Sequence, residues 1–248
     1  MTVDSGLILA LDTSGDVCSA ASVRDGVLIS EHIFRHGMHL SERLLDHITE
    51  VLADAGGTPE QCDAFAVGLG PGSFTGVRIG IMTIKTFAEL LEKPVYATGS
   101  LVAMAASVRD IPNAFVVPVH PCRAGVVYSG IYKLTGNAVH TELEAGAYPL
   151  AELAATATEL KGTLVFCGPA ASKDANRELI LDTAGIGVER VVFSSVIYPR
   201  ASEIGRIAAA RIEAGDSGTT ALSVVPMYIS PPPITMGKGL NAPPVATN

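Results

Sequence analysis

One order of predicted elements, strand-strand-strand-helix-strand-helix, occurs twice along the chain. Residues 6–11, 17–24, 27–34, 40–55, 63–69 and 77–92 carry it first. Residues 115–119, 126–134, 138–143, 150–160, 163–167 and 172–180 repeat it. Mixed strands and helices in this order favour α/β layers, and a duplicated unit favours two similar lobes with a cleft between them. The repeat therefore predicts a duplicated α/β fold with mixed sheets.

Local patterns support these elements. Residues 6–11 are a continuous apolar run, which is typical of a buried strand. Asp25-Gly26 is a hairpin turn signal, and Gly56-Gly57 ends a helix whose apolar residues recur on one face. Each half closes with a further strand and helix, at 95–97 with 100–108 and at 188–193 with 202–214. We therefore expect an N-terminal lobe at 1–108, a C-terminal lobe at 109–228 and a flexible Pro-rich tail at 229–248.

Composition limits the function classes. The 248 residues are 48% hydrophobic and 17% charged, which excludes global disorder. The net charge of −8 disfavours direct binding to the phosphate backbone of a nucleic acid. No apolar run reaches the ~18 residues of a membrane span, and the first residues lack the basic region of a signal peptide. The four cysteines form no CxxC pair. They predict buried thiols in a cytoplasmic protein.

The glycine-rich run at 70–76 lies between a predicted strand and a predicted helix, where a turn can approach a phosphate. It departs from three common fingerprints by single positions. Val77 stands where a P-loop needs lysine, Thr75 stands where a dinucleotide turn needs glycine, and Pro71 stands where a nucleophile elbow needs glycine. The run alone assigns no enzyme class.

Three motifs together resemble the TsaB (YeaZ) family, the partner subunit of the bacterial machinery that makes threonylcarbamoyladenosine in tRNA. They are LALDTS at 9–14, GPGSFTGVRIG at 70–80, and the pattern Arg123-x-Gly125-x-Val127-Tyr128. The resemblance covers residues 6–130 well and the remainder weakly. It implies an actin-like (ASKHA, ribonuclease H-like) two-lobed fold, which agrees with the duplicated pattern.

The same resemblance implies a noncatalytic scaffold that activates the catalytic paralogue TsaD, with TsaE as a possible further partner. TsaD carries a metal-binding His-x-x-x-His after the corresponding helix, whereas residues 97–107 of this chain contain no histidine. We therefore expect no catalytic residue, no metal and no tightly bound cofactor here. ATP and metal are expected on the partner subunits, and this chain is expected to bind little or no tRNA.

Site residues follow from the motifs. At the glycine-rich turn, Gly70, Gly72 and Gly76 are expected to shape the backbone beside Pro71. Ser73 and Thr75 are expected to cap the helix, and Arg78 is expected to pair with a carboxylate or a carbonyl. The cleft candidates are Asp12, Thr13 and Arg123. Pro121 stands where the family usually has an aspartate, which leaves Asp12 as the one carboxylate placed at the cleft.

His32 and His36 have His-x-x-x-His spacing, and His39 follows. They fall at the end of a predicted strand, where a spacing of four does not bring side chains together as it does on a helix. They also precede the glycine-rich turn, on the wrong side for the paralogue's metal site. We therefore expect solvated or helix-entry roles for these histidines.

The predicted helix at 77–92 is apolar around half of its circumference or more, beyond the ~100° that packing on one sheet needs. The surplus has two explanations, neighbouring helices within the lobe or a protein interface. The family pairs through its first two long helices, so the interface candidates are Leu44, Ile48, Ile81, Ile84 and Leu91. A homodimer in isolation would use the same patch.

Two other functions remain open on the sequence. An ASKHA-fold kinase or ATPase would use Asp12 and the glycine-rich turn on phosphates, although one carboxylate is thin support for phosphoryl transfer. A glycoprotease-like hydrolase would need a metal set or a Ser-His-Asp arrangement, and the sequence assembles neither. The tail remains open as a ligand for proline-binding domains.

Overall fold

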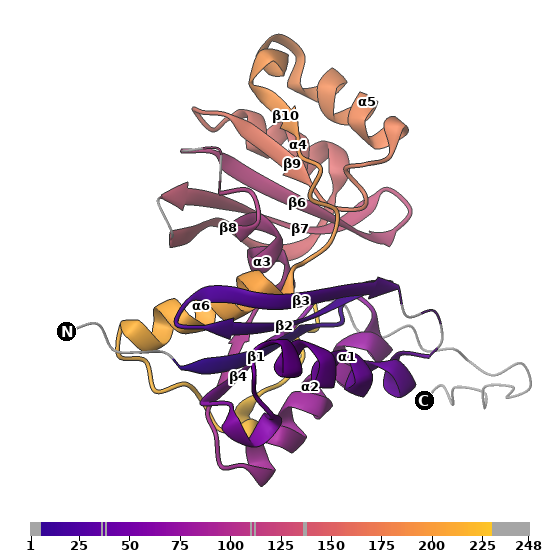
Figure 1. Cartoon of the computed structure of the whole chain (residues 1–248). Helices are drawn as coiled ribbons and strands as arrows, with labels where there is room; N and C mark the ends of the chain where they lie inside the picture. The colour runs from indigo at the N-terminus through magenta and orange to yellow at the C-terminus, as the bar shows by residue number, and fades with distance from the viewer. Residues whose placement is uncertain are drawn as a thin grey trace, which may run out of the picture.

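The computed structural model describes residues 6–35, 37, 39–109, 111, 113–135 and 138–229, and it contains two five-stranded sheets (Figure 1). The strands of the first sheet lie in the order β3-β2-β1-β4-β5. They are β1 (Leu7–Asp12), β2 (Val17–Arg24), β3 (Val27–Arg35), β4 (Ala64–Gly68) and β5 (Val95–Thr98). β1, β2 and β3 are antiparallel, whereas β4 and β5 are parallel to β1, so the sheet is mixed.

The second sheet repeats this order, because β8-β7-β6-β9-β10 corresponds strand by strand to β3-β2-β1-β4-β5. Its strands are β6 (Phe115–Arg123), β7 (Val126–Thr135), β8 (Ala138–Pro149), β9 (Leu164–Cys167) and β10 (Val191–Phe193). The pattern of antiparallel and parallel pairs is also the same. The predicted duplication is therefore confirmed.

Two helices cover the outer face of each sheet (Figure 1). α1 (Leu40–Asp54) and α2 (Phe74–Leu90) pack on the first sheet, and α4 (Leu150–Thr158) and α5 (Asp174–Ala184) pack on the second. β1 is buried on both sides, so its residues alternate between two apolar cores: Leu9 faces α1 and α2, while Ile8 faces the layer between the sheets. This double burial explains the continuous apolar run.

The helix that ends each half crosses to the sheet of the other half. α3 (Ser100–Ala106) follows β5, yet Leu101 and Met104 join the core of the second sheet. α6 (Ala201–Glu213) follows β10, yet Ile204 and Ala208 pack on β1 and β2. Both helices lie between the sheets (Figure 1). The predicted lobe boundary was therefore wrong for α6, because the apolar face of this helix is buried against the first sheet.

The chain after α6 also remains with the first lobe. Thr219 forms a bridge with Val95, and Ala221 and Val224 enter the core beneath α2. Met227 donates its backbone N–H to the Leu69 carbonyl at 2.9 Å. Residues 201–228 thus belong to the first lobe rather than to the second. Residues 230–248 of the predicted tail lie outside the described residues.

Short 3-10 helices complete the described part of the chain, at Pro59–Gln61, Gly185–Arg190 and Ala221–Ser223. Cys18, Cys62 and Cys167 are buried free thiols, as predicted, and Cys122 is half-buried and also free. Among the described residues no helix is both long and apolar enough to span a membrane.

Candidate functional site

The glycine-rich turn is packed against the turn that follows β1. A Cβ at Gly72 would collide with the backbone carbonyl of Ser14, and a Cβ at Gly80 would collide with the side chain of Thr13. The Thr13 hydroxyl donates to the Gly76 carbonyl at 2.8 Å. These glycines therefore let a neighbouring segment of the same chain approach the start of α2 closely.

Several backbone N–H groups of the turn are already occupied by this packing. Ser73 donates its N–H to the Ser14 carbonyl at 2.6 Å, and Gly70 donates to the Ser100 hydroxyl at 3.0 Å. Gly76 donates to the Ser73 hydroxyl at 3.2 Å. A phosphate-binding turn offers such groups to an anion, whereas here three of them bind groups of the protein itself.

Ser73 is the N-cap of α2, as predicted, and its cap starts the helix at Phe74, three residues before the predicted start. The capping role expected for Thr75 was wrong, because this residue lies within the first turn of the helix with an exposed side chain. One hydroxyl at the N-cap position is sufficient to begin the helix.

Among the described residues, Arg78 pairs with Tyr228 and Phe74 rather than with the expected carboxylate or carbonyl. Its Nε donates to the Tyr228 hydroxyl at 2.8 Å, and its guanidinium carbon lies 3.7 Å from the centroid of the Phe74 ring. Stacking and hydrogen bonding together hold the segment that returns after α6 against the start of α2. Sequence reasoning missed Tyr228 because it lies 150 positions from Arg78.

Asp12 is buried behind the turn rather than presented to solvent, with 1% of its surface exposed. One oxygen, Oδ1, accepts from the N–H and hydroxyl of Ser14 at 2.9 and 2.7 Å. The other, Oδ2, accepts from the Ser100 hydroxyl at 2.6 Å. Burial raises the pKa of the Asp12 carboxyl, while these hydrogen bonds and the charge of His120 oppose the rise.

A cleft of about 490 Å³ lies between the two lobes beside the glycine-rich turn. The first lobe lines it with Ser14, Gly15, Asp16, residues 71–74 and Val77; the second lobe adds His120, Pro121, Cys122, Tyr128, Pro169 and Tyr198; and the returning segment closes it with residues 226–229. The cleft thus forms where the two similar halves meet, as the duplication predicts.

The predicted cleft residues Asp12, Thr13 and Arg123 do not line this cleft. Asp12 and Thr13 are buried beneath it, and Arg123 is exposed at the end of β6, directly before the hairpin turn to β7. The carboxylate that does reach the cleft is Asp16, which is exposed. The sequence could have indicated Asp16, because it lies in the turn directly after the Asp-Thr-Ser motif.

The second lobe presents His120 and Pro121 to the cleft. Burial lowers the pKa of the His120 imidazole, against the opposing effects of the Pro121 carbonyl, Asp12 and Asp16. The imidazole is therefore biased toward its neutral form. At Pro121, where the resemblance implies an aspartate, an uncharged ring faces the cleft instead.

The predicted interface anchors Leu44, Ile48, Ile81 and Ile84 are at most 2% exposed and belong to the core of the first lobe. Leu91 is partly buried against the same core. The prediction was therefore wrong for the four buried residues. They form the stripes of α1 and α2 that face the sheet, so this part of the apolar surface of α2 is covered within the lobe.

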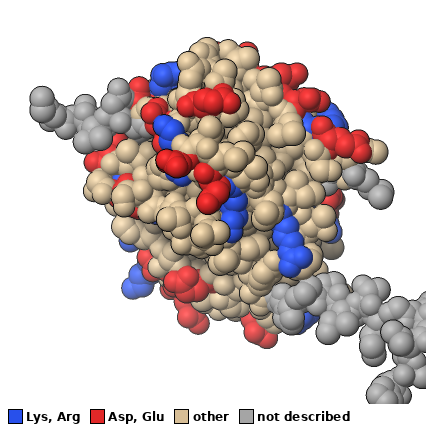
Figure 2. Space-filling model, turned by 90° about the horizontal axis from the view of Figure 1, so that it is seen from below, with Lys and Arg blue, Asp and Glu red and all other residues tan. Residues whose placement is uncertain are grey.

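The exposed side chains of α1 and α2 lie outside these buried stripes, and we call them the outer helical face. Its exposed apolar side chains are Leu45 (53%), Met82 (59%) and Leu90 (75%). Thr49 and Thr86 lie one turn beyond Leu45 and Met82 and are also exposed. Figure 2 views the molecule from below Figure 1, where charged groups lie scattered among larger uncharged areas. Among the described residues, Leu45, Met82 and Leu90 are the large apolar side chains that α1 and α2 expose to solvent.

One of the three histidines differs from expectation. His39 lies directly before α1, where it pairs with Glu42 at 3.1 Å, and this fits the expected helix-entry role. His32 has neither of the expected roles, because it is half-buried on β3 and contacts His47 and Glu50 of α1. His36 lies outside the described residues. Sequence spacing missed this group because its members come from two elements.

The region that would carry the paralogue's metal-binding histidines forms β5 and α3. Leu101, Ala103 and Met104 are buried between the two sheets, in the cores described above. In this chain the region therefore consists of apolar side chains packed in the protein core.

A family model described as TsaD, tRNA N6-adenosine threonylcarbamoyltransferase, matches residues 36–185, which is more than half of the chain. A curated Bacillus subtilis relative, "tRNA threonylcarbamoyladenosine biosynthesis protein TsaB", is 36% identical over 126 residues, 51% of this chain and 55% of the relative. The chain thus spans about half the length of the curated relatives it matches.

Solved structures extend the match over most of the chain. A Pseudomonas aeruginosa protein described as similar to peptidase YeaZ has a TM-score of 0.75 and 26% identity, covering 91% of this chain and 100% of its own. A ROK hexokinase from Thermus thermophilus has a TM-score of 0.52 at 14% identity, covering 85% of this chain and 99% of its own, and shows the fold alone. The predicted actin-like fold is therefore confirmed. Together these matches show that the chain belongs to the family of the TsaD model and, within it, to the TsaB (YeaZ) family.

Proposed function

We propose that this chain is a noncatalytic partner subunit that binds and activates TsaD in the threonylcarbamoyladenosine modification of tRNA. In this proposal TsaD performs the transfer, and the partner subunits supply the nucleotide and the metal. The chain contributes a folded surface. Its negative charge is consistent with this division, because little of the tRNA would need to contact it.

The observation that carries the proposal is the packing of residues 97–107. The resemblance places the metal-binding His-x-x-x-His of TsaD in this region, where this chain instead has an apolar helix buried between the sheets. A metal ligand set cannot be built there without disrupting both cores. The family scaffold is retained, and the residue types that bind the metal in the paralogue are replaced.

The glycine-rich turn supports the same proposal. The N–H groups of Gly70, Ser73 and Gly76 are bound within the protein, and the Asp12 carboxylate is buried and hydrogen-bonded at both oxygens. These contacts also disfavour the kinase alternative, in which the same groups face phosphates. They stabilise the junction between β1 and α2 instead.

The outer helical face is the proposed docking surface for TsaD. Helices present small and apolar side chains there, and exposed apolar groups on a monomer favour association. Two copies of this chain would pair through the same face when TsaD is absent, because paralogues of one fold share equivalent surfaces.

The test is co-elution of the purified chain with folded TsaD in size-exclusion chromatography, combined with titration to obtain Kd. We expect a stable complex, and we expect Met82→Glu to weaken it about tenfold or more, because a charge would be buried at the interface. Leu179→Glu is the matched control, since Leu179 is a half-exposed apolar residue on α5 of the other lobe. No complex with the parent chain, or equal weakening by both variants, would overturn the proposal.

A further inference from the structure

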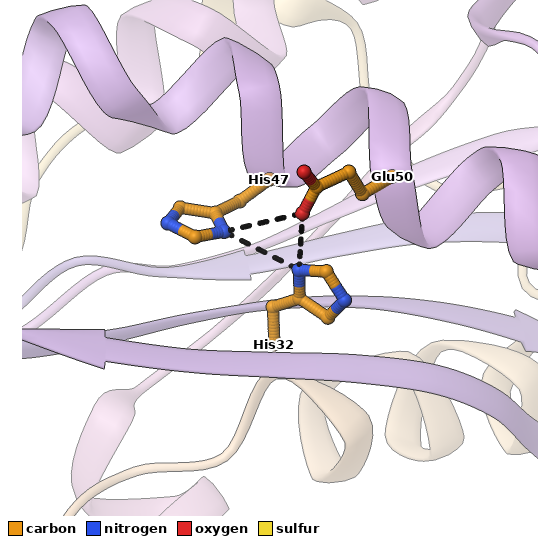
Figure 3. A group of neighbouring side chains, drawn as sticks. All are labelled: His32, His47 and Glu50. Atoms are coloured by element: carbon orange, nitrogen blue, oxygen red, sulfur yellow. Dashed lines mark hydrogen bonds and ion pairs between the residues drawn. The ribbon is translucent and has the colours of Figure 1, made fainter.

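His32, His47 and Glu50 form a compact group between β3 and α1, outside the cleft (Figure 3). The two Nδ1 atoms lie 3.3 Å apart, and Glu50 Oε2 lies 3.1 Å from His32 Nδ1 and 3.9 Å from His47 Nδ1. A tetrahedral ion with bonds of about 2.0–2.1 Å separates its ligand atoms by about 3.3 Å. The three atoms therefore have the spacing of three ligands around one ion.

The orientation of the rings points to the same conclusion. Both imidazoles direct Nδ1 toward the same carboxylate oxygen, as Figure 3 shows. Each neutral ring has one nitrogen that accepts and one that donates, so two facing Nδ1 atoms compete for protons. A cation would satisfy the three converging electron pairs at once.

The surroundings hold the group in place. The Phe34 ring stacks on the His47 ring with centroids 3.8 Å apart and 24° between the planes. His32 belongs to a paired strand, and its backbone lies opposite Ala20 of β2. Burial lowers the pKa of the His47 imidazole, with Arg43 and His32 adding to this effect and Glu50 and Asp46 opposing it. The neutral imidazole is the form that ligates metal.

The group is also reachable. The side chains of His32 and His47 are 29% and 17% exposed, while that of Glu50 is 61% exposed and therefore lies at the solvent edge. An ion can enter past Glu50 and retain a fourth position for water or for a donor from another molecule.

From this geometry we infer that His32, His47 and Glu50 form a binding site for a divalent transition-metal ion of the zinc class. Two imidazoles and one carboxylate are a ligand set that suits Zn²⁺, whereas Mg²⁺ prefers oxygen ligands alone. Binding would link α1 to β3. The inference does not depend on the proposed partnership with TsaD, because it rests on these three side chains alone.

The experiment uses the full chain without a histidine tag, stripped of metal by a chelator. Calorimetric titration with Zn²⁺ is expected to show one site. Thermal unfolding in excess Zn²⁺ is expected to shift upward by about 5–10 °C at a concentration near one hundred times Kd. Mg²⁺ is expected to produce neither effect.

The absorption spectrum of bound Co²⁺ identifies the atoms that ligate the metal. The expected absorption is that of tetrahedral cobalt bound by nitrogen and oxygen, without a thiolate charge-transfer band. A thiolate band would place the metal on a cysteine such as Cys122 and would overturn the inference.

The variants separate binding from folding. Glu50→Gln changes a mostly exposed side chain, so the chain is expected to stay folded while Zn²⁺ binding weakens about tenfold or more. His47→Gln is expected to abolish the cobalt spectrum. His39→Gln is the matched control, because His39 and Glu42 form an exposed pair that no third ligand joins among the described residues. No one-site binding, or equal loss in His39→Gln and Glu50→Gln, would contradict the inference.

Discussion

At the scale of single residues, the glycine-rich turn shows how a motif can be recognised and yet misread. Its sequence suggested an approach to phosphate, whereas the structure brings Thr13 and Ser14 of the same chain against it. The need for glycine was predictable from the sequence. The neighbour that requires it was not, because Thr13 and Gly80 come together only when β1 and α2 pack.

Gly80→Ala tests this account of the turn. The added methyl group would meet the Thr13 side chain, so we expect a loss of about 1–3 kcal/mol in the free energy of unfolding. Urea denaturation measures it. Gly99→Ala is the control, because a Cβ there makes ordinary contacts and its backbone φ of −62° suits alanine. A neutral Gly80→Ala would show that the close approach is not required.

Asp12→Asn tests the buried carboxylate. A carboxyl whose pKa is higher in the folded than in the unfolded chain holds its proton more tightly when folded. Its contribution to stability is therefore complete below its ordinary pKa of 3.8 and is lost as the pH rises through the raised value. Asparagine removes this dependence while preserving the shape of the side chain.

We expect the free energy of unfolding of Asp12→Asn, relative to the parent chain, to increase as the pH rises through that interval. Urea unfolding of both proteins from about pH 4 to about pH 8 measures the difference. A difference that stays constant over this range would mean that Asp12 has the same pKa in the folded and unfolded chains.

At the scale of elements, α2 shows what amphipathic pattern can and cannot reveal. Its apolar surplus was visible in the sequence, and so were its two explanations. The pattern does not state which stripe faces the sheet, since Ile84 and Met82 are both apolar and lie only two positions apart. The structure separates them, because Ile84 joins the core while Met82 faces outward.

Ile84→Ala and Met82→Ala form a pair of substitutions that test this division. Ile84→Ala is expected to cost about 2–5 kcal/mol of stability, because it opens a cavity under α2. Met82→Ala is expected to cost less than about 0.5 kcal/mol. Denaturant midpoints with unchanged slopes measure both. Similar losses from the two variants would mean that Met82 is also packed within the lobe.

At the scale of the whole molecule, the duplicated order predicted the two lobes, while the crossing of α3 and α6 was not predictable from either half. Each of these helices has an apolar face, and nothing local to it specifies which sheet will cover that face. Connections between halves depend on contacts that are distant in sequence, such as those of Glu31 with Arg200 and Ser202.

Glu31→Ala tests how strongly the chain is tied back to the first lobe. The Glu31 carboxylate is 3% exposed, and it accepts from Arg200 Nε at 3.0 Å and from the Ser202 N–H at 3.1 Å. Removal of the carboxylate takes away the acceptor to which these two donors bind at the start of α6. We therefore expect the free energy of unfolding to fall by about 1–3 kcal/mol. Glu142→Ala, at an exposed position on β8, is expected to be neutral. If both variants retain full stability, this contact does not secure α6.

The partnership with TsaD is the central claim, and its most direct measurement is tRNA threonylcarbamoylation by purified TsaD with and without this chain. The reaction is supplied with the threonylcarbamoyl donor, nucleotide and metal, and the modified adenosine is quantified. The account predicts no product from this chain alone, a large increase when it is added to TsaD, and loss of that increase with Met82→Glu but not with Leu179→Glu. Product formation by this chain in the absence of TsaD, or TsaD activity that does not respond to its addition, would contradict it.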